Sequence, residues 1–152
     1  MKIISGGQTG VDRGSLDAAI AAGTKHGGWC PRGRLAEDGT IPGRYALRET
    51  PSSEYPARTE QNVLDSDATL IISRGDPTGG TELTVRLARK HGKPCWIVDL
   101  DDLPDVAAAI TNIRRWLKSN AVEVLNVAGP RESQNAGIAA AAEQFVSRLL
   151  VP

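Results

Sequence analysis

Apolar residues occur along this chain at two spacings. Short continuous apolar runs predict buried strands at residues 2–5, 68–73, 95–100 and 122–128, and a weaker run predicts one at 26–30. Apolar positions three or four apart predict helices at 13–22, 57–66, 80–91, 104–119 and 136–150. Five strands alternating with helices predict an α/β fold. We expect a three-layer Rossmann-like domain over residues 1–152, with a central, mostly parallel sheet of five or slightly more strands.

Residues 32–56 interrupt this alternation. The segment is rich in glycine, proline and charge and has no hydrophobic period. A loop of this length in a compact domain is usually a lid, a binding loop or a disordered arm. It follows a strand, so we expect it to overhang the carboxyl edge of the sheet. Its ordering would require a compensating contact, either with a ligand through its arginines or with a neighbouring subunit through Ile41, Tyr45 and Leu47.

The charge balance argues against broad electrostatic binding. Lys and Arg total 18, Asp and Glu total 18, and the net charge is zero, which does not favour a nucleic-acid or membrane-surface partner. No apolar run has the length of a membrane span, and the start of the chain does not resemble a signal peptide. Thirteen of the 18 cations are Arg, whose planar fork suits phosphate or carboxylate. The two cysteines indicate free thiols in a reducing, cytoplasmic location.

The loop of residues 5–10, Ser-Gly-Gly-Gln-Thr-Gly, lies between the first predicted strand and the first predicted helix. Its bare backbone could direct N–H groups toward an anion at a helix N-terminus, and the alternative is a tight turn without a ligand. The loop lacks the Gly-Lys-Ser/Thr of a P-loop and the spacing of a dinucleotide fingerprint. A phosphate-bearing or oxyanion ligand remains the interpretation that this loop favours.

Two further loops follow predicted strands, at residues 73–82 and 126–133. Because parallel strands end at one sheet edge, we expect all three loops to meet where α/β proteins bind ligands. Asp12 could cap the first helix, Glu82 could simply favour a helix start, and Trp29 could stack on a ring or pack in the core. The candidate ligand-binding residues are Gly6, Gly7, Gln8, Thr9, Gly10, Arg13, Arg32, Arg74, Thr78, Gly79, Gly80, Thr81, Glu82, Gly129 and Arg131.

Catalytic and metal-ligating sets are not evident. His26 and His91 lie outside the three loops, and Cys30 and Cys95 have no close partners at zinc-ligand spacing. We therefore name no catalytic residue and no metal ligand, and favour a binding protein over an enzyme.

Distinctive segments occur throughout the chain, at residues 5–14, 28–34, 36–39, 47–50, 58–60, 65–71, 79–81 and 125–131. In these segments the chain resembles the family named putative molybdenum carrier proteins, which are Rossmann-like and related to the lysine-decarboxylase-like (LONELY GUY) superfamily. The resemblance implies binding of molybdenum cofactor, a phosphorylated pterin dithiolene that carries the metal, and a homo-oligomer such as a dimer or tetramer.

The wider superfamily includes phosphoribohydrolases, whose hallmark is Pro-Gly-Gly-x-Gly-Thr-x-x-Glu. Here Thr78-Gly79-Gly80-Thr81-Glu82 lacks the middle glycine, and the acid directly follows the threonine. That shift turns the carboxylate by roughly 200° about the helix axis, so the hydrolase chemistry does not carry over. An N-glycosidase acting on a nucleotide or sugar phosphate, and a nucleotide sensor without turnover, remain the alternatives.

Overall fold

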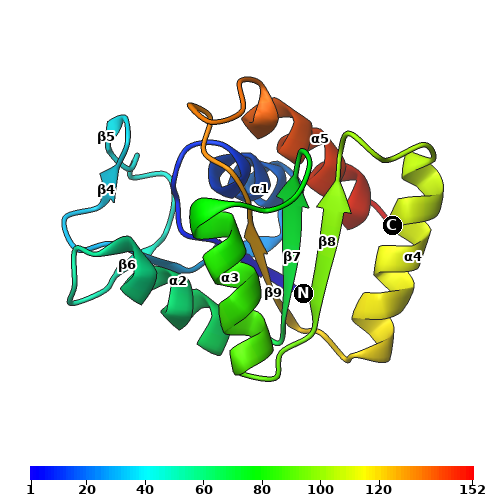
Figure 1. Cartoon of the computed structure of the whole chain (residues 1–152), viewed down its shortest axis with the longest axis horizontal. Coiled ribbons are helices and arrows are strands. Elements are labelled where there is room, and N and C mark those ends of the chain that lie inside the picture. The colour runs from blue at the N-terminus through cyan, green and yellow to red at the C-terminus, as the bar shows by residue number, and fades with distance from the viewer.

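The computed structural model describes residues 1–152 as alternating strands and helices around one sheet (Figure 1). The strands are β1 (Lys2–Ile4), β2 (Lys25–Gly27), β3 (Trp29–Cys30), β4 (Leu35–Ala36), β5 (Gly39–Thr40), β6 (Arg48–Glu49), β7 (Ala68–Ser73), β8 (Cys95–Asp99) and β9 (Val124–Ala128). The helices are α1 (Val11–Ala21), α2 (Tyr55–Leu64), α3 (Gly79–Lys90), α4 (Val106–Ser119) and α5 (Ile138–Leu150).

The central sheet has five parallel strands in the order β2-β1-β9-β7-β8. The last strand of the chain therefore lies in the middle, with Leu125 opposite both Ile3 on β1 and Ala68 on β7. Sequence periodicity predicts the five strands and their parallel arrangement, and the structure confirms the α/β class. Sequence periodicity does not predict the order of the strands, because the order depends on pairing between distant segments.

Helices cover both faces of the sheet. α2 and α3 lie together in front of the sheet in Figure 1, and α1 and α5 pack against each other behind it. The main core fills the α1, α4 and α5 side, where Ile113, Phe145 and Val146 meet Leu70 and Leu125. At the crossing of α1 and α5, a Cβ on Gly14 would lie 2.2 Å from the Ala139 carbonyl oxygen, so the close approach requires glycine.

The predicted strand at residues 26–30 is broken into β2 and β3. Gly28 separates them with φ +127°, and a Cβ there would lie 2.2 Å from the carbonyl oxygen of Ser5. β2 pairs with β1, whereas β3 leaves the main sheet and pairs with β6. The glycine thus turns the chain out of the sheet and starts the 32–56 segment, called the arm below.

The arm is ordered by contacts within its own chain. β4 and β5 form a small antiparallel hairpin, and Ile41 and Tyr45 are buried with Leu16 and Cys30 in a second apolar cluster. The Arg34 guanidinium donates to the carbonyl oxygens of Ile41, Pro42 and Tyr45. These residues recur without a regular period, so the sequence pattern did not reveal that they form a core. Neither a ligand nor a second subunit is needed to bury them.

Candidate functional site

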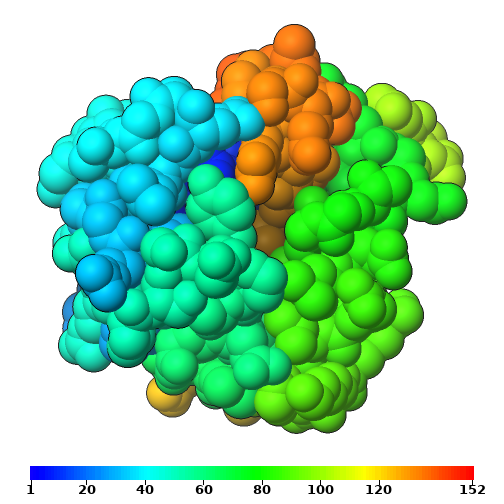
Figure 2. All heavy atoms as spheres, turned by 60° about the vertical axis from the view of Figure 1, so that its left-hand side comes forward, coloured from blue at the N-terminus to red at the C-terminus, as the bar shows by residue number.

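A cavity of about 390 Å³ lies at the carboxyl edge of the sheet, where the loops after β1, β7 and β9 meet the start of α2. Figure 2 shows the hollow between the arm and α2 on one side and α3 and the 129–137 segment on the other. Its lining residues are Gln8, Asp12, Tyr55, Pro56, Arg58, Thr59, Gly79, Gly80, Thr81, Leu83, Thr84, Arg86, Ala128, Gly129, Arg131 and Gln134. Three arginines and one carboxylate give the cavity a positive balance.

A buried ion pair borders the cavity. Arg58 Nη1 lies 3.2 Å from Asp12 Oδ2, and the two side chains are 13% and 5% exposed. Burial raises the pKa of the Asp12 carboxyl, while Arg58 and the Gln8 N–H oppose that rise. Arg58 Nε is buried without a hydrogen-bond partner. A Cβ on Gly6 would lie 1.8 Å from Arg58 Nη1, so this glycine makes room for the guanidinium.

This pair changes the interpretation of Asp12. The sequence suggests that Asp12 caps α1, but the N-cap residue is Gly10 and no side chain caps that position. Asp12 instead lies in the first turn, where its carboxylate accepts a hydrogen bond from the Gln8 N–H at 3.2 Å and pairs with Arg58. The carboxylate is a buried counter-ion between α1 and α2.

The first turn of α3 forms the open side of the cavity. Thr78, Gly79 and Gly80 are exposed, and the Thr78 side chain makes no cap hydrogen bond. A Cβ added at Gly79 or Gly80 would meet no atom within 4 Å. A helix start with free N–H groups and no covering side chain is suited to an anion.

Arg131 lies at the carboxyl end of β9, beside the aromatic ring of Tyr55. Its guanidinium carbon is 4.8 Å from the ring centroid, within the range of a cation–π contact. Neighbouring Gly129 is held close to the sheet, since a Cβ there would lie 2.1 Å from the Ile72 carbonyl oxygen. The close packing at Gly129 thus fixes where the chain carrying Arg131 leaves the sheet.

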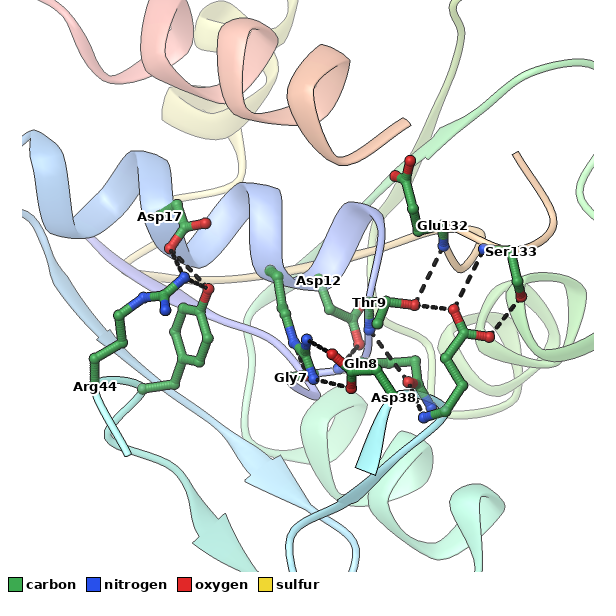
Figure 3. Close-up of polar contacts among 12 residues, drawn as sticks. Gly7, Gln8, Thr9, Asp12, Asp17, Asp38, Arg44, Glu132 and Ser133 are labelled. Carbon is green, nitrogen blue, oxygen red and sulfur yellow. Dashed lines mark hydrogen bonds and ion pairs between the residues drawn. The ribbon is translucent and has the colours of Figure 1, made fainter. Parts of the chain in front are cut away.

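The 5–10 loop is largely closed by the protein itself. The backbone N–H of Gln8 donates to Asp12, and that of Thr9 donates to the Gln8 side chain. Arg13 donates to the Gly7 carbonyl oxygen and pairs with Asp38 on the arm at 2.5 Å (Figure 3). A Cβ on Gly10 would lie 2.2 Å from the Pro130 carbonyl oxygen. Of this loop, only Gln8 lines the cavity described above.

The structure therefore separates the candidate ligand-binding residues into two groups. Those lining the cavity are Gln8, Gly79, Gly80, Thr81, Gly129 and Arg131. Those outside its lining are Gly6, Gly7, Thr9, Gly10, Arg13, Arg32, Arg74, Thr78 and Glu82.

Several residues outside the lining have other partners. Glu82 lies 3.5 Å from Arg86 in an exposed i,i+4 pair, and Arg74 donates to the Ala136 carbonyl oxygen. Arg32 is an exposed residue at the base of the arm. Trp29 is half-buried and also lies outside the cavity, with its indole N–H donating to Asp65.

Sequence reasoning missed the contribution of α2, which supplies Tyr55, Pro56, Arg58 and Thr59 to the lining. The sequence did contain a signal: Arg58 and Asn62 are polar residues four positions apart, so they share one face of the predicted helix. The structure shows that this face points inward, since Asn62 is buried. Polar residues at helical spacing on a buried face indicate a site or a buried network.

No group of three His, Cys, Asp or Glu side chains is close enough to hold a metal ion, and Cys30 and Cys95 are free thiols. His91 lies 3.3 Å from Glu60, and His26 accepts a hydrogen bond from the Ala46 N–H. None of the helices has both the length and the apolar character needed to cross a bilayer.

Comparison with known proteins identifies the family. Residues 3–150 match the model of the Circularly permutated YpsA SLOG family. The chain belongs to this family. Its sheet agrees with a permuted Rossmann order: if β9 and α5 preceded β1, the strands would read 3-2-1-4-5 across the sheet. The break in that order falls between β9 and β7, beside the cavity.

A close structural relative comes from Syntrophus aciditrophicus SB. Its crystal structure at 1.45 Å resolution is named a putative molybdenum carrier protein, and it is 48% identical to this chain. The TM-score is 0.94, and the match covers 99% of this chain and 94% of that chain. No curated protein matches this chain. The resemblance to molybdenum carrier proteins is thus confirmed at the level of sequence and fold.

Proposed function

We propose that this protein binds a phosphorylated heterocycle in the cavity, with molybdenum cofactor as the first candidate, and holds it as a carrier. One observation carries the proposal: the open first turn of α3 faces the same cavity as Arg131 and Arg86, while the only lining carboxylate is paired with Arg58. The lining therefore presents positive charge and free donors and contains no unpaired acid to repel an anion, and the exposed Glu82 beside it is paired with Arg86. The name of the 48% identical relative, a putative molybdenum carrier protein, supports a ligand that contains molybdenum.

The lining residues fit such a ligand in different ways. The phosphate would bind at the exposed N–H groups of Gly79 and Gly80, with Arg131 as a charged partner. Leu83, Pro56 and the Tyr55 ring offer apolar contact for a heterocycle. The cavity contains no thiol, so a molybdenum atom would be held by the sulfurs of its own cofactor.

A nucleotide-processing enzyme is the second candidate, because the cavity has a buried carboxylate, Asp12, beside its lining arginines. Its acid–base chemistry is restricted by the pairing with Arg58. Glu82, which stands nearest to the hydrolase glutamate in sequence, is exposed, lies outside the lining and is paired with the lining residue Arg86. We therefore expect no release of free base from nucleoside monophosphates at enzyme-like rates.

The decisive experiment is mass spectrometry of small molecules that co-purify with the protein, followed by calorimetric titration with neopterin monophosphate, adenosine monophosphate and molybdate. A carrier of a phosphorylated pterin should retain a pterin-derived compound and bind neopterin monophosphate more tightly than the other two. Preference for adenosine monophosphate would favour the nucleotide alternatives, and free adenine in that titration would identify an enzyme. Failure to bind any of the three would contradict the proposed function.

A further inference from the structure

The tip of the arm is attached to two separate loops of the domain through adjacent acidic residues. Glu37 accepts hydrogen bonds from the Thr9 hydroxyl, from the Ser133 hydroxyl at 2.5 Å and from the Ser133 N–H at 3.3 Å (Figure 3). Asp38 accepts two hydrogen bonds from the Arg13 guanidinium, at 2.5 and 2.8 Å. The first acid thus joins the β1–α1 loop to the β9–α5 loop, and the second fastens the arm to α1.

Little else holds this tip. Residues 37–40 are all exposed and Leu35 is 45% exposed, so the β4–β5 hairpin buries little apolar surface beyond Ala36, which packs against the second apolar cluster. By contrast, Ile41 and Tyr45 at the base of the arm are each only 1% exposed. A segment with a packed base and a tip held mainly by polar contacts can open at the tip while the base stays folded.

The two loops joined by Glu37 both contribute to the cavity. Gln8 lies on its lining, and its side-chain oxygen accepts hydrogen bonds from the N–H groups of Thr9 and Glu37. Arg131 and Gln134 also line the cavity and lie on either side of Ser133 in the chain. Glu37 is outside the cavity lining, and its contacts add to the direct hydrogen bonds that join these two loops, from the Val11 N–H to the Pro130 carbonyl oxygen and from the Glu132 N–H to the Thr9 hydroxyl.

We propose that Glu37 and Asp38 form a carboxylate latch at the rim of the cavity, and that Glu37 is a positioning residue for Arg131 and Gln8. This inference rests on the proposed function, since it assigns the latch to retention of the same anionic ligand. Both carboxylate oxygens accept hydrogen bonds here, one from the Thr9 hydroxyl and the Ser133 N–H and the other from the Ser133 hydroxyl. In Glu37→Gln the amide NH₂ can donate to the Ser133 hydroxyl in return, so the variant removes the charge that strengthens these hydrogen bonds and weakens the latch with almost no change of shape.

The first test needs no ligand. Hydrogen exchange is compared for the wild-type chain, Glu37→Gln and Glu54→Gln, which alters an exposed carboxylate of the same arm that makes no cap hydrogen bond. We expect exchange in residues 35–40 and 131–135 to become about tenfold faster in Glu37→Gln, because weaker neutral hydrogen bonds replace charge-assisted ones, with no change in β7. Equal exchange in the two variants would overturn the latch.

The second test measures retention by stopped-flow binding of neopterin monophosphate to the same three proteins. Glu37→Gln should release this probe several-fold faster than Glu54→Gln, since the loop that carries Arg131 is held less firmly at the rim. If the variants release it equally, the positioning role of Glu37 is wrong, whatever the exchange result. If the wild-type chain does not bind the probe, the proposed function fails for pterins, and the latch is judged by exchange alone.

Discussion

Two glycine-rich loops at the same sheet edge differ in what their backbones face. In the 5–10 loop, Gly6, Gly7 and Gly10 are buried, and a Cβ on any of them would collide with Arg58, Leu47 or Pro130. In the loop before α3, Gly79 and Gly80 are exposed and their missing side chains would meet nothing. The first loop uses glycine for close packing within the protein, and the second leaves a helix start uncovered.

The acidic residues around each loop account for the difference. Asp12 and Glu37 bind donors of the 5–10 loop, and Glu132 binds the N–H groups of Gly137 and Ala139 at the start of α5. The only acid in the first turn of α3 is Glu82, which turns outward to Arg86. Glycine content alone therefore does not identify an anion site. The neighbouring carboxylates indicate which donors are already used.

The largest effect is expected at the buried pair. Arg58→Met and Asp12→Asn should each lower the free energy of unfolding by about 3–5 kcal/mol, because each leaves the remaining partner buried and uncompensated. Urea denaturation measures the change. Arg86→Met is the matched control on the open side, where loss of the exposed pair with Glu82 should cost about 0.3–0.5 kcal/mol. If the Asp12–Arg58 and Glu82–Arg86 variants lost similar amounts of unfolding free energy, the two pairs would not differ in the way proposed.

A smaller effect is expected from glycine replacements. Gly10→Ala should lower the free energy of unfolding by about 2–4 kcal/mol, since φ is +82° and the new Cβ would collide with the Pro130 carbonyl oxygen. Gly80→Ala is the control in the open loop and should raise stability by about 0.4–1 kcal/mol by restricting the unfolded chain. Thermal unfolding of both variants checks this. A destabilising Gly80→Ala would mean that the open loop also packs against protein.

Binding of a phosphorylated ligand should depend on Arg131, which lines the same cavity as the uncovered start of α3. Arg131→Gln should weaken binding of neopterin monophosphate by about 1.5–3 kcal/mol, if a charge-assisted hydrogen bond is lost from the cavity. Arg32→Gln, which changes an exposed arginine outside the lining, should leave the affinity unchanged. Calorimetric titration of the two variants decides the matter. Equal loss in both would indicate a diffuse electrostatic effect and not a defined site.

The smallest effect is expected for the pH dependence of stability, through Glu37 and Asp38 beside the 5–10 loop. Desolvation opposes ionisation of Glu37, but hydrogen bonds from Ser133 and Thr9, with Arg131 nearby, outweigh it and lower its pKa. The hydrogen bond from Arg13 lowers the pKa of Asp38. Groups with lowered pKa values in the folded state stabilise it above their ordinary values, and that stabilisation is lost as the pH falls through the folded pKa.

The corresponding measurement compares wild-type protein with the Glu37→Gln/Asp38→Asn double variant in urea at several pH values. Their difference in unfolding free energy should be constant above about pH 5 and should shrink below about pH 4, where the carboxyls of the unfolded chain are protonated before those of the folded protein. Glu54→Gln provides the baseline for an exposed acid of the arm. A difference that persists unchanged to pH 3 would show that the latch acts through shape and not through charge.

Much of the fold could be predicted from local patterns. All six residues of β7 are buried, as its continuous apolar run predicts, and the loops after β1, β7 and β9 do share one edge. The site was predicted less completely because its key partners are distant in the chain. Arg58 reaches Asp12 across 46 residues, and Glu37 reaches Ser133 across 96, and neither separation leaves a local signal. The arm likewise becomes ordered through Leu16 and Cys30, which lie outside it.

The central position of β9 also determines when this chain can complete its fold during synthesis. Before residues 124–128 leave the ribosome, β1 can pair only with β2 and β7 only with β8, because β9 alone joins the two halves. The Ser5 hydroxyl donates to the Val127 carbonyl oxygen, which lies 122 residues later in the chain, so this hydrogen bond also cannot form before β9 is synthesised. Contacts between such distant residues slow folding, so the five-stranded sheet cannot be completed until residues 124–128 have emerged.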